Sequence, residues 1–174
     1  MATITGGEKL LAQLREMTEQ VGKPITLRVG FLEGATYPDK SKDRLREIYR
    51  KRDQKLNDKP LKGAVGGVSV AMVAAINEFG APSRSQPPRP FFRTMIAEKK
   101  GSWAENVKAL LLFHEYNGKK VLQLMGEEIS ADLRDSIRDF SDPPLKPSTF
   151  KAKGFDKPLI DTAHMLHSVA YDVK

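Results

Sequence analysis

Three side chains near the C-terminal end have the types and spacing that could bind a metal ion. His164 and His167 are three residues apart, and Asp161 lies three residues before His164. On a helical turn these side chains share one face, where imidazole and carboxylate groups could coordinate zinc. No fourth ligand is obvious, and the pattern differs from the His-Glu-x-x-His motif of zinc hydrolases. A surface or subunit contact for the histidines and a helix N-cap role for Asp161 are the commoner uses, and we predict no metal site.

Two glycine-containing motifs could carry a catalytic serine or a bound phosphate. Residues 67–71, Gly-Val-Ser-Val-Ala, are similar to a nucleophile elbow with alanine in place of the last glycine, but no strand pattern precedes Ser69. The glycines at 63, 66 and 67 lack the following Lys-Ser/Thr pair that holds nucleotide phosphates. A loop-to-helix junction capped by Ser69, after a flexible hinge, is the simpler interpretation. We therefore predict a protein that is not an enzyme and that has no catalytic residues and no cofactor.

Hydrophobic periodicity predicts the elements in the first half of the chain. Residues 7–21 have the spacing of an amphipathic helix that should lie on something apolar, and residues 25–31 alternate as a half-buried strand. Residues 69–79 predict an apolar helix that ends at Gly80. Its inward face is expected to contain Met72, Val73, Ile76 and Phe79. The proline-rich residues 81–90 favour an extended path.

The second half of the chain is predicted to be mainly helical. Two helices are expected over residues 90–96 and 103–113, and the cleanest amphipathic helix spans residues 121–140. The apolar stripe of that helix contains Leu122, Met125, Ile129, Leu133, Ile137 and Phe140, and its opposite face contains Glu127, Glu128, Asp132, Arg134, Asp135 and Arg138. Residues 141–157 are expected to form a loop and residues 168–173 a closing strand. The pattern predicts one α+β domain over residues 1–174, with a small antiparallel sheet packed by several helices.

Composition and charge narrow the class of protein. The chain has 174 residues, a formal net charge of +7 and no cysteine, so packing and partners must stabilise it without disulfides. No apolar run is long enough for a membrane span, and we expect assembly in the host cytoplasm. Much of the positive charge lies in residues 40–62, within a long charged insertion loop at 33–66. A solvated loop, a contact to an acidic subunit and a nucleic-acid patch are all compatible with this stretch.

Two longer segments carry a resemblance to a known family. Residues 76–82, Ile-Asn-Glu-Phe-Gly-Ala-Pro, and residues 87–93, Pro-Pro-Arg-Pro-Phe-Phe-Arg, resemble a signature of tailed-phage virion-morphogenesis and tail-completion (head-tail joining, neck) proteins. Residues 144–169 are similar to a second signature of that family, with Ala163 where the family usually has glycine. The residues that match the family motifs are Glu78, Phe79, Gly80, Pro88, Arg89, Pro90, Phe91, Leu159, Asp161 and Thr162.

The resemblance implies a structural virion protein of a tailed phage or prophage, located in the tail or neck. Such a protein would form a ring, with sixfold or twelvefold symmetry, and would bind tail tube, terminator or connector proteins around a channel for passing DNA. We expect Phe79, Phe91 and Phe92 to anchor the proline-rich segment on the core. Subunit contacts are expected from the arginines and lysines of residues 81–93 and 141–157, namely Arg84, Arg89, Arg93, Lys146, Lys151 and Lys153. The alternative is that these two segments are ordinary packed loops, whose charged side chains contact water and no neighbouring subunit.

A basic cytoplasmic nucleic-acid-binding protein is the alternative from another class. It predicts a DNA affinity that falls steeply with salt. That affinity would disappear when Lys51, Arg52 and Lys55 are neutralised.

Overall fold

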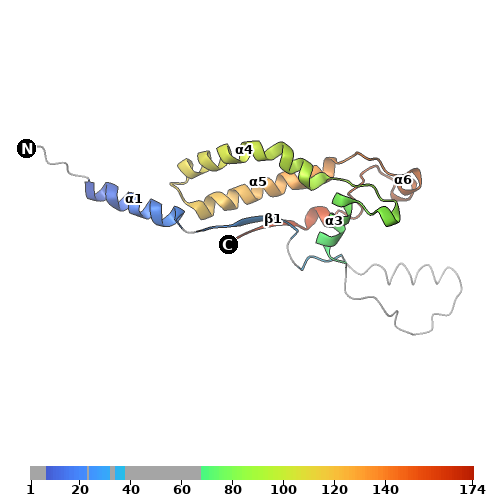
Figure 1. Cartoon of the computed structure of the whole chain (residues 1–174), viewed down its shortest axis with the longest axis horizontal. Helices are drawn as coiled ribbons and strands as arrows, with labels where there is room; N and C mark the ends of the chain where they lie inside the picture. Colours follow the sequence, from blue (N-terminus) through green and yellow to red (C-terminus); the bar gives the residue numbers. More distant parts are fainter. Residues whose placement is uncertain (1–6, 23, 32–33, 38–67) are drawn as a thin grey trace, which may run out of the picture. The chain divides into compact units, whose positions relative to one another are not determined.

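The computed structural model describes residues 7–22, 24–31, 34–37 and 68–174 (Figure 1). The insertion expected at 33–66 therefore lies outside the described residues, apart from its beginning at 34–37, and so does the basic stretch at 40–62. The chain divides into two compact units, one of residues 1–30, 91–137 and 169–174 and the other of residues 31–90 and 138–168. Both units are built from segments that are far apart in the sequence. The expectation of a single domain stays a prediction.

The first unit is a helical hairpin packed on a two-stranded sheet. The hairpin consists of α4 (Phe91–Phe113) and α5 (Gly118–Asp139), which run side by side in Figure 1. Strands β1 (Leu27–Phe31) and β2 (Val169–Val173) pair with each other. Thr26 and Lys174 exchange two backbone hydrogen bonds of 2.7 and 3.0 Å, as directly opposed residues of an antiparallel pair do. The predicted α+β class with a small antiparallel sheet is confirmed.

The core of the first unit lies along one face of α5. Its fully buried residues recur at three- and four-residue steps: Val121, Met125, Gly126, Ser130, Leu133 and Ile137. Of the predicted apolar stripe, Met125, Leu133 and Ile137 are confirmed as buried, whereas the assignment of Leu122, Ile129 and Phe140 to the buried face of this helix is wrong. Leu122 and Ile129 are only half-buried, and α5 ends before Phe140. Gly126 lies on the buried face because Tyr171 of β2 and Leu27 of β1 approach it closely. Ser130 is buried there as well, and a hydrophobicity pattern does not score either residue as core.

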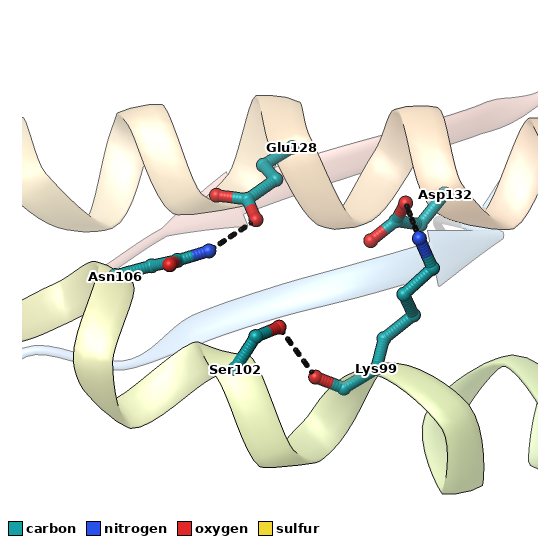
Figure 2. A network of polar contacts seen from close by, with 5 residues as sticks. All are labelled: Lys99, Ser102, Asn106, Glu128 and Asp132. Atoms are coloured by element: carbon teal, nitrogen blue, oxygen red, sulfur yellow. Dashed lines mark hydrogen bonds and ion pairs between the residues drawn. The ribbon is translucent and has the colours of Figure 1, made fainter.

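Polar contacts join the two helices of the hairpin (Figure 2). Lys99 of α4 lies 3.3 Å from Asp132 of α5, and the Asn106 amide donates a 2.6 Å hydrogen bond to Glu128. On the same helix Ser102 donates to the carbonyl of Lys99. Glu128 and Asp132 were expected on a solvent face, but they are half-buried because α4 covers that side of α5. Each of these partly exposed pairs contributes modestly to the free energy of unfolding. Because both pairs join α4 to α5, together they favour one alignment of the two helices along each other.

Helix α4 is continuous where the sequence predicted two helices. It runs through Lys99, Lys100 and Gly101, which interrupt the apolar pattern without breaking the helix. An isolated glycine inside a helix costs only about 1 kcal/mol relative to alanine. The helix ends where Glu115 and Tyr116 take positive φ angles, and Asn117 then caps α5 by accepting a 3.0 Å hydrogen bond from the Lys120 backbone. The predicted break at Asn117-Gly118 is confirmed.

The second unit consists of short helices and loops. They are α3 (Val70–Phe79), the 3-10 turn η1 (Pro82–Arg84), α6 (Pro147–Lys153) and α7 (His164–His167). Thr36 forms an antiparallel bridge with Ser69 just before α3. Residues 141–157 were predicted as loop throughout, but Pro147 takes the first position of α6, where proline suits a helix. The proline-rich segment is not extended throughout, since η1 closes a tight turn bridged by Ala81 and Gln86.

Helix α1 (Gly7–Val21) begins the first unit, at the predicted position. In the described part of the chain, no helix is both long enough and apolar enough to cross a membrane.

Candidate functional site

The residues that match the family motifs gather mainly in the second unit. Residues 76–82, 87–90 and 144–168 of the two motif segments belong to this unit, although they lie far apart in the sequence. Residues 91–93 and Val169 are the exceptions, because they begin α4 and β2 in the first unit. The first motif therefore supplies the end of one compact unit and the start of the other.

The first motif segment folds back on the end of α3. The Arg89 backbone donates a 2.7 Å hydrogen bond to the carbonyl of Asn77, and the Gln86 amide donates to the Asn77 side chain at 3.0 Å. Gly80 makes this return path possible, since its φ is 77° and an added β-carbon would lie 2.8 Å from the nitrogen of Pro88. Only glycine combines this backbone conformation with such a close approach. The Glu-Phe-Gly and Pro-Pro-Arg-Pro residues therefore form one structural feature.

Glu78 and Arg89 are both in the interior, with 6% and 9% of their surfaces exposed. The sequence placed Arg89 at an exposed edge, and the structure corrects that position. Among the described residues the Arg89 Nε has no hydrogen-bond partner, and removal from water lowers the pKa of its guanidinium. A subunit contact at Arg89 stays a prediction.

Lys153 lies close enough to Arg89 for the two cations to repel each other. Burial lowers the pKa of Lys153 most, and Arg89 lowers it further, while Asp161 and Asp156 act in the opposite direction. The Lys153 Nζ donates a 2.7 Å hydrogen bond to the carbonyl of Lys157 and lies 5.1 Å from the ring centre of Phe155. Lys153 is therefore held within its own unit, whereas it was expected to project outward.

The other predicted contact residues are distributed differently. Lys146 and Lys151 at α6 are exposed, as is Arg93 on α4. The side chain of Arg84 lies outside the described residues. The exposed lysines of α6 are consequently the predicted contact residues of the second unit that remain available to a partner in the described part of the chain.

The second motif segment ends in a tight turn that leads into α7. Leu159 is 7% exposed and fixes this end of the segment, whereas Asp161 and Thr162 are at the surface. Asp161 was predicted to cap the helix, but the N-cap is Ala163, which has a φ of 57° and no side-chain capping bond. Ala163 is thus a left-handed residue at a position where the family usually has glycine.

Glycine at position 163 is expected to stabilise the fold. A β-carbon in the left-handed region costs about 1–2 kcal/mol, and glycine gives back part of this as backbone entropy. Ala163→Gly should therefore raise the free energy of unfolding by about 0.5–1 kcal/mol, measured by urea denaturation. Gly154, the C-cap of α6 with a φ of 78°, is the matched control, since Gly154→Ala should lower that free energy. Loss of stability in Ala163→Gly would contradict the assignment of the turn.

His164 has partners other than a metal. Its Nε2 donates a 2.9 Å hydrogen bond to the carbonyl oxygen of Thr36. Its ring packs against Tyr37, with the two ring centroids 4.8 Å apart. His167 is exposed. Within the described ranges no group of three or more His, Asp or Glu side chains could hold a metal ion. Of the three residues considered as metal ligands, His164 packs locally, and Asp161 and His167 lie at the surface.

Tyr37 gives this cluster a measurable signature. Burial, followed by the nearby charge of Asp161, raises the pKa of the Tyr37 hydroxyl above 10.0. A raised folded-state pKa means that Tyr37 supports the fold below pH 10 and loses that contribution as the pH rises through its own pKa. Burial, followed by the hydrogen bond to Glu127, also raises the pKa of Tyr171. Spectrophotometric titration should therefore show a late-ionising component to which both tyrosines contribute, and the Tyr37 part of it should disappear in Tyr37→Phe and ionise earlier in Asp161→Asn. A wild-type curve that coincides with that of Asp161→Asn would contradict the proximity of the two groups.

Sequence reasoning missed the exposed apolar face of α3. Val70, Ala74 and Glu78 form the buried face, whereas Met72 and Phe79, both predicted to face inward, are 60% and 68% exposed. Val68, which precedes the helix, is 54% exposed. The signal was present, because residues 70–76 are apolar on every side of the helix, and such a helix usually has neighbours on more than one side. We call Val68, Met72 and Phe79 the α3 stripe.

Comparison of the chain with protein-family models, curated proteins and solved structures gives no match.

Proposed function

We propose that this chain is a structural protein of a tailed-phage or prophage particle that completes the tail or neck at the head-to-tail joint. It would act by assembling into a ring and by binding tail tube, terminator or connector proteins around the path of the DNA. The observation that supports this best is that both motif segments contribute to one compact unit. There the return of residues 86–89 onto α3 explains the spacing of the first motif, and buried Leu159 explains the apolar position of the second.

The surface of the second unit favours binding to proteins. Met72 and Phe79 are exposed and seven residues apart, which places them on one side of α3, and exposed Val68 directly precedes the helix. Large apolar side chains that share one exposed side of a helix are a common feature of protein interfaces. Exposed lysines of α6 add positive charge, which suits a partner with acidic groups. On this basis we propose a role in binding and assembly and no catalytic activity.

The mass of the purified chain in solution tests the assembly part of this proposal. Light scattering should detect a species several times the mass of one chain, and negative-stain images of that species should show closed rings with a single rotational symmetry. A chain that is monomeric both in solution and within isolated particles would overturn ring assembly. A monomer in solution that becomes a ring on the particle would instead place assembly under the control of a partner.

A further inference from the structure

Helix α1 has an apolar face that is open to solvent. Leu10, Leu11 and Leu14 are 59%, 56% and 49% exposed. An isolated helix of about 12–15 residues is only marginally stable in water, and most helices in proteins are stabilised by packing of their apolar face. Helix α1 spans 15 residues, so it needs a surface on which its leucines can pack.

Helix α1 also differs in charge from the chain as a whole. The helix contains three acidic residues (Glu8, Glu16 and Glu19) and two basic residues (Lys9 and Arg15). Its net charge is therefore −1, whereas that of the whole chain is +7. Copies of a chain with that positive charge repel each other unless their contact pairs regions of opposite sign. An acidic, leucine-rich helix therefore fits a basic surface that exposes apolar groups.

The second unit has such a surface at α6. Phe150 and Phe155 are 46% and 39% exposed, and they alternate with basic residues. Residues 146–157 contain four lysines and one aspartate, for a net charge of +3. Lys146 and Lys151 are exposed, whereas Lys153 is committed to the carbonyl of Lys157. We call Lys146, Phe150, Lys151 and Phe155 the α6 surface.

We propose that α1 of one copy packs on the α6 surface of the next copy of the same chain, with its leucines against the phenylalanines and with Glu8 and Glu19, which helical spacing places on the Leu11 side of that face, beside the lysines. The two surfaces lie in different units of the chain, so the contact is heterologous, and repetition of such a contact around an axis closes a ring. This inference rests on the proposed function for the expectation of a closed ring, and it adds the two surfaces that would make it.

Two complementary variants test the contact directly. The first carries Leu10→Gln, Leu11→Gln and Leu14→Gln, which remove the apolar face while keeping residues of high helix propensity. The second carries Phe150→Gln and Lys151→Glu. Light scattering should find each variant monomeric and their equimolar mixture dimeric, because the first retains the α6 surface and the second retains α1. Leu112→Gln is the matched control, since Leu112 is a 59% exposed leucine of α4 and should leave assembly unchanged.

A charge exchange separates the electrostatic part of the contact from general effects on folding. Glu8→Lys with Glu19→Lys should weaken assembly at low salt, as should Lys146→Glu with Lys151→Glu, and all four changes in one chain should restore it. Circular dichroism confirms that each variant retains the wild-type helix content.

Three results would overturn the contact. Assembly of either variant alone would indicate an interface elsewhere, a monomeric mixture would exclude heterologous pairing, and a monomeric wild-type chain at its highest soluble concentration would exclude self-contact through these surfaces. None of these decides whether the chain is part of a phage particle. That question is settled by the location of the chain in particles.

Discussion

Phe91→Ala should lower the free energy of unfolding by about 3–5 kcal/mol, the cost of removing a large buried aromatic side chain. Phe91 is 1% exposed at the start of α4, and its carbonyl accepts a 2.7 Å hydrogen bond from Ser136 of α5. Loss of the ring would leave a cavity in the core. Urea denaturation followed by circular dichroism measures the effect.

Phe79→Ala is the matched control within the same motif. Phe79 is 68% exposed, so its removal should change the free energy of unfolding by less than about 1 kcal/mol. Equal losses from the two substitutions would contradict the assignment of Phe91 to the core and Phe79 to the surface. Weaker binding of particle proteins by Phe79→Ala, without loss of stability, would support a contact role for the α3 stripe.

Gly126→Ala should lower the free energy of unfolding by about 1–3 kcal/mol, although alanine is the better helix former. A β-carbon at Gly126 would lie 2.5 Å from Cδ2 and 2.7 Å from Cγ of Tyr171, and 3.0 Å from Leu27. Strands β1 and β2 would have to move away from α5 to accommodate it. The helix-propensity gain of about 1 kcal/mol does not offset this overpacking. Urea denaturation, followed by the circular dichroism of the helices, measures this loss of unfolding free energy.

The same substitution in α4 should act in the opposite direction. No atom lies within 4 Å of the position that a β-carbon would take at Gly101, so Gly101→Ala should gain up to about 1 kcal/mol from helix propensity alone. Stabilisation by both alanine substitutions would show that the strands do not pack closely on Gly126.

Sequence reasoning located the elements whose apolar residues recur with one clear periodicity. It failed where it had to say which side of a helix is buried, or where contacts between segments far apart in the sequence determine the structure. Helix α1, strand β1 and the closing strand β2 were correctly located, because each has one clear apolar periodicity. The buried face of α3 was assigned to the wrong residues. Most positions of that helix are apolar, so periodicity contains no information about which side faces the core.

The candidate site was predictable as a set of segments and not as a geometry. The two motif segments were identified from residue types alone, but residue types reveal neither the burial of Arg89 nor the hydrogen bond that ties Lys153 to the carbonyl of Lys157. The N-cap at Ala163 was missed because a left-handed alanine is rare, and sequence reasoning favoured the nearby aspartate.

The location of the chain in phage particles tests the central claim most directly. Antibodies against the purified chain, coupled to gold and applied to tailed particles from the source of the sequence, can be located by electron microscopy. The account predicts gold at the joint between head and tail and recovery of the chain from purified particles by mass spectrometry. Particles that lack the chain while it accumulates free in the producing cells would contradict a structural role in the virion.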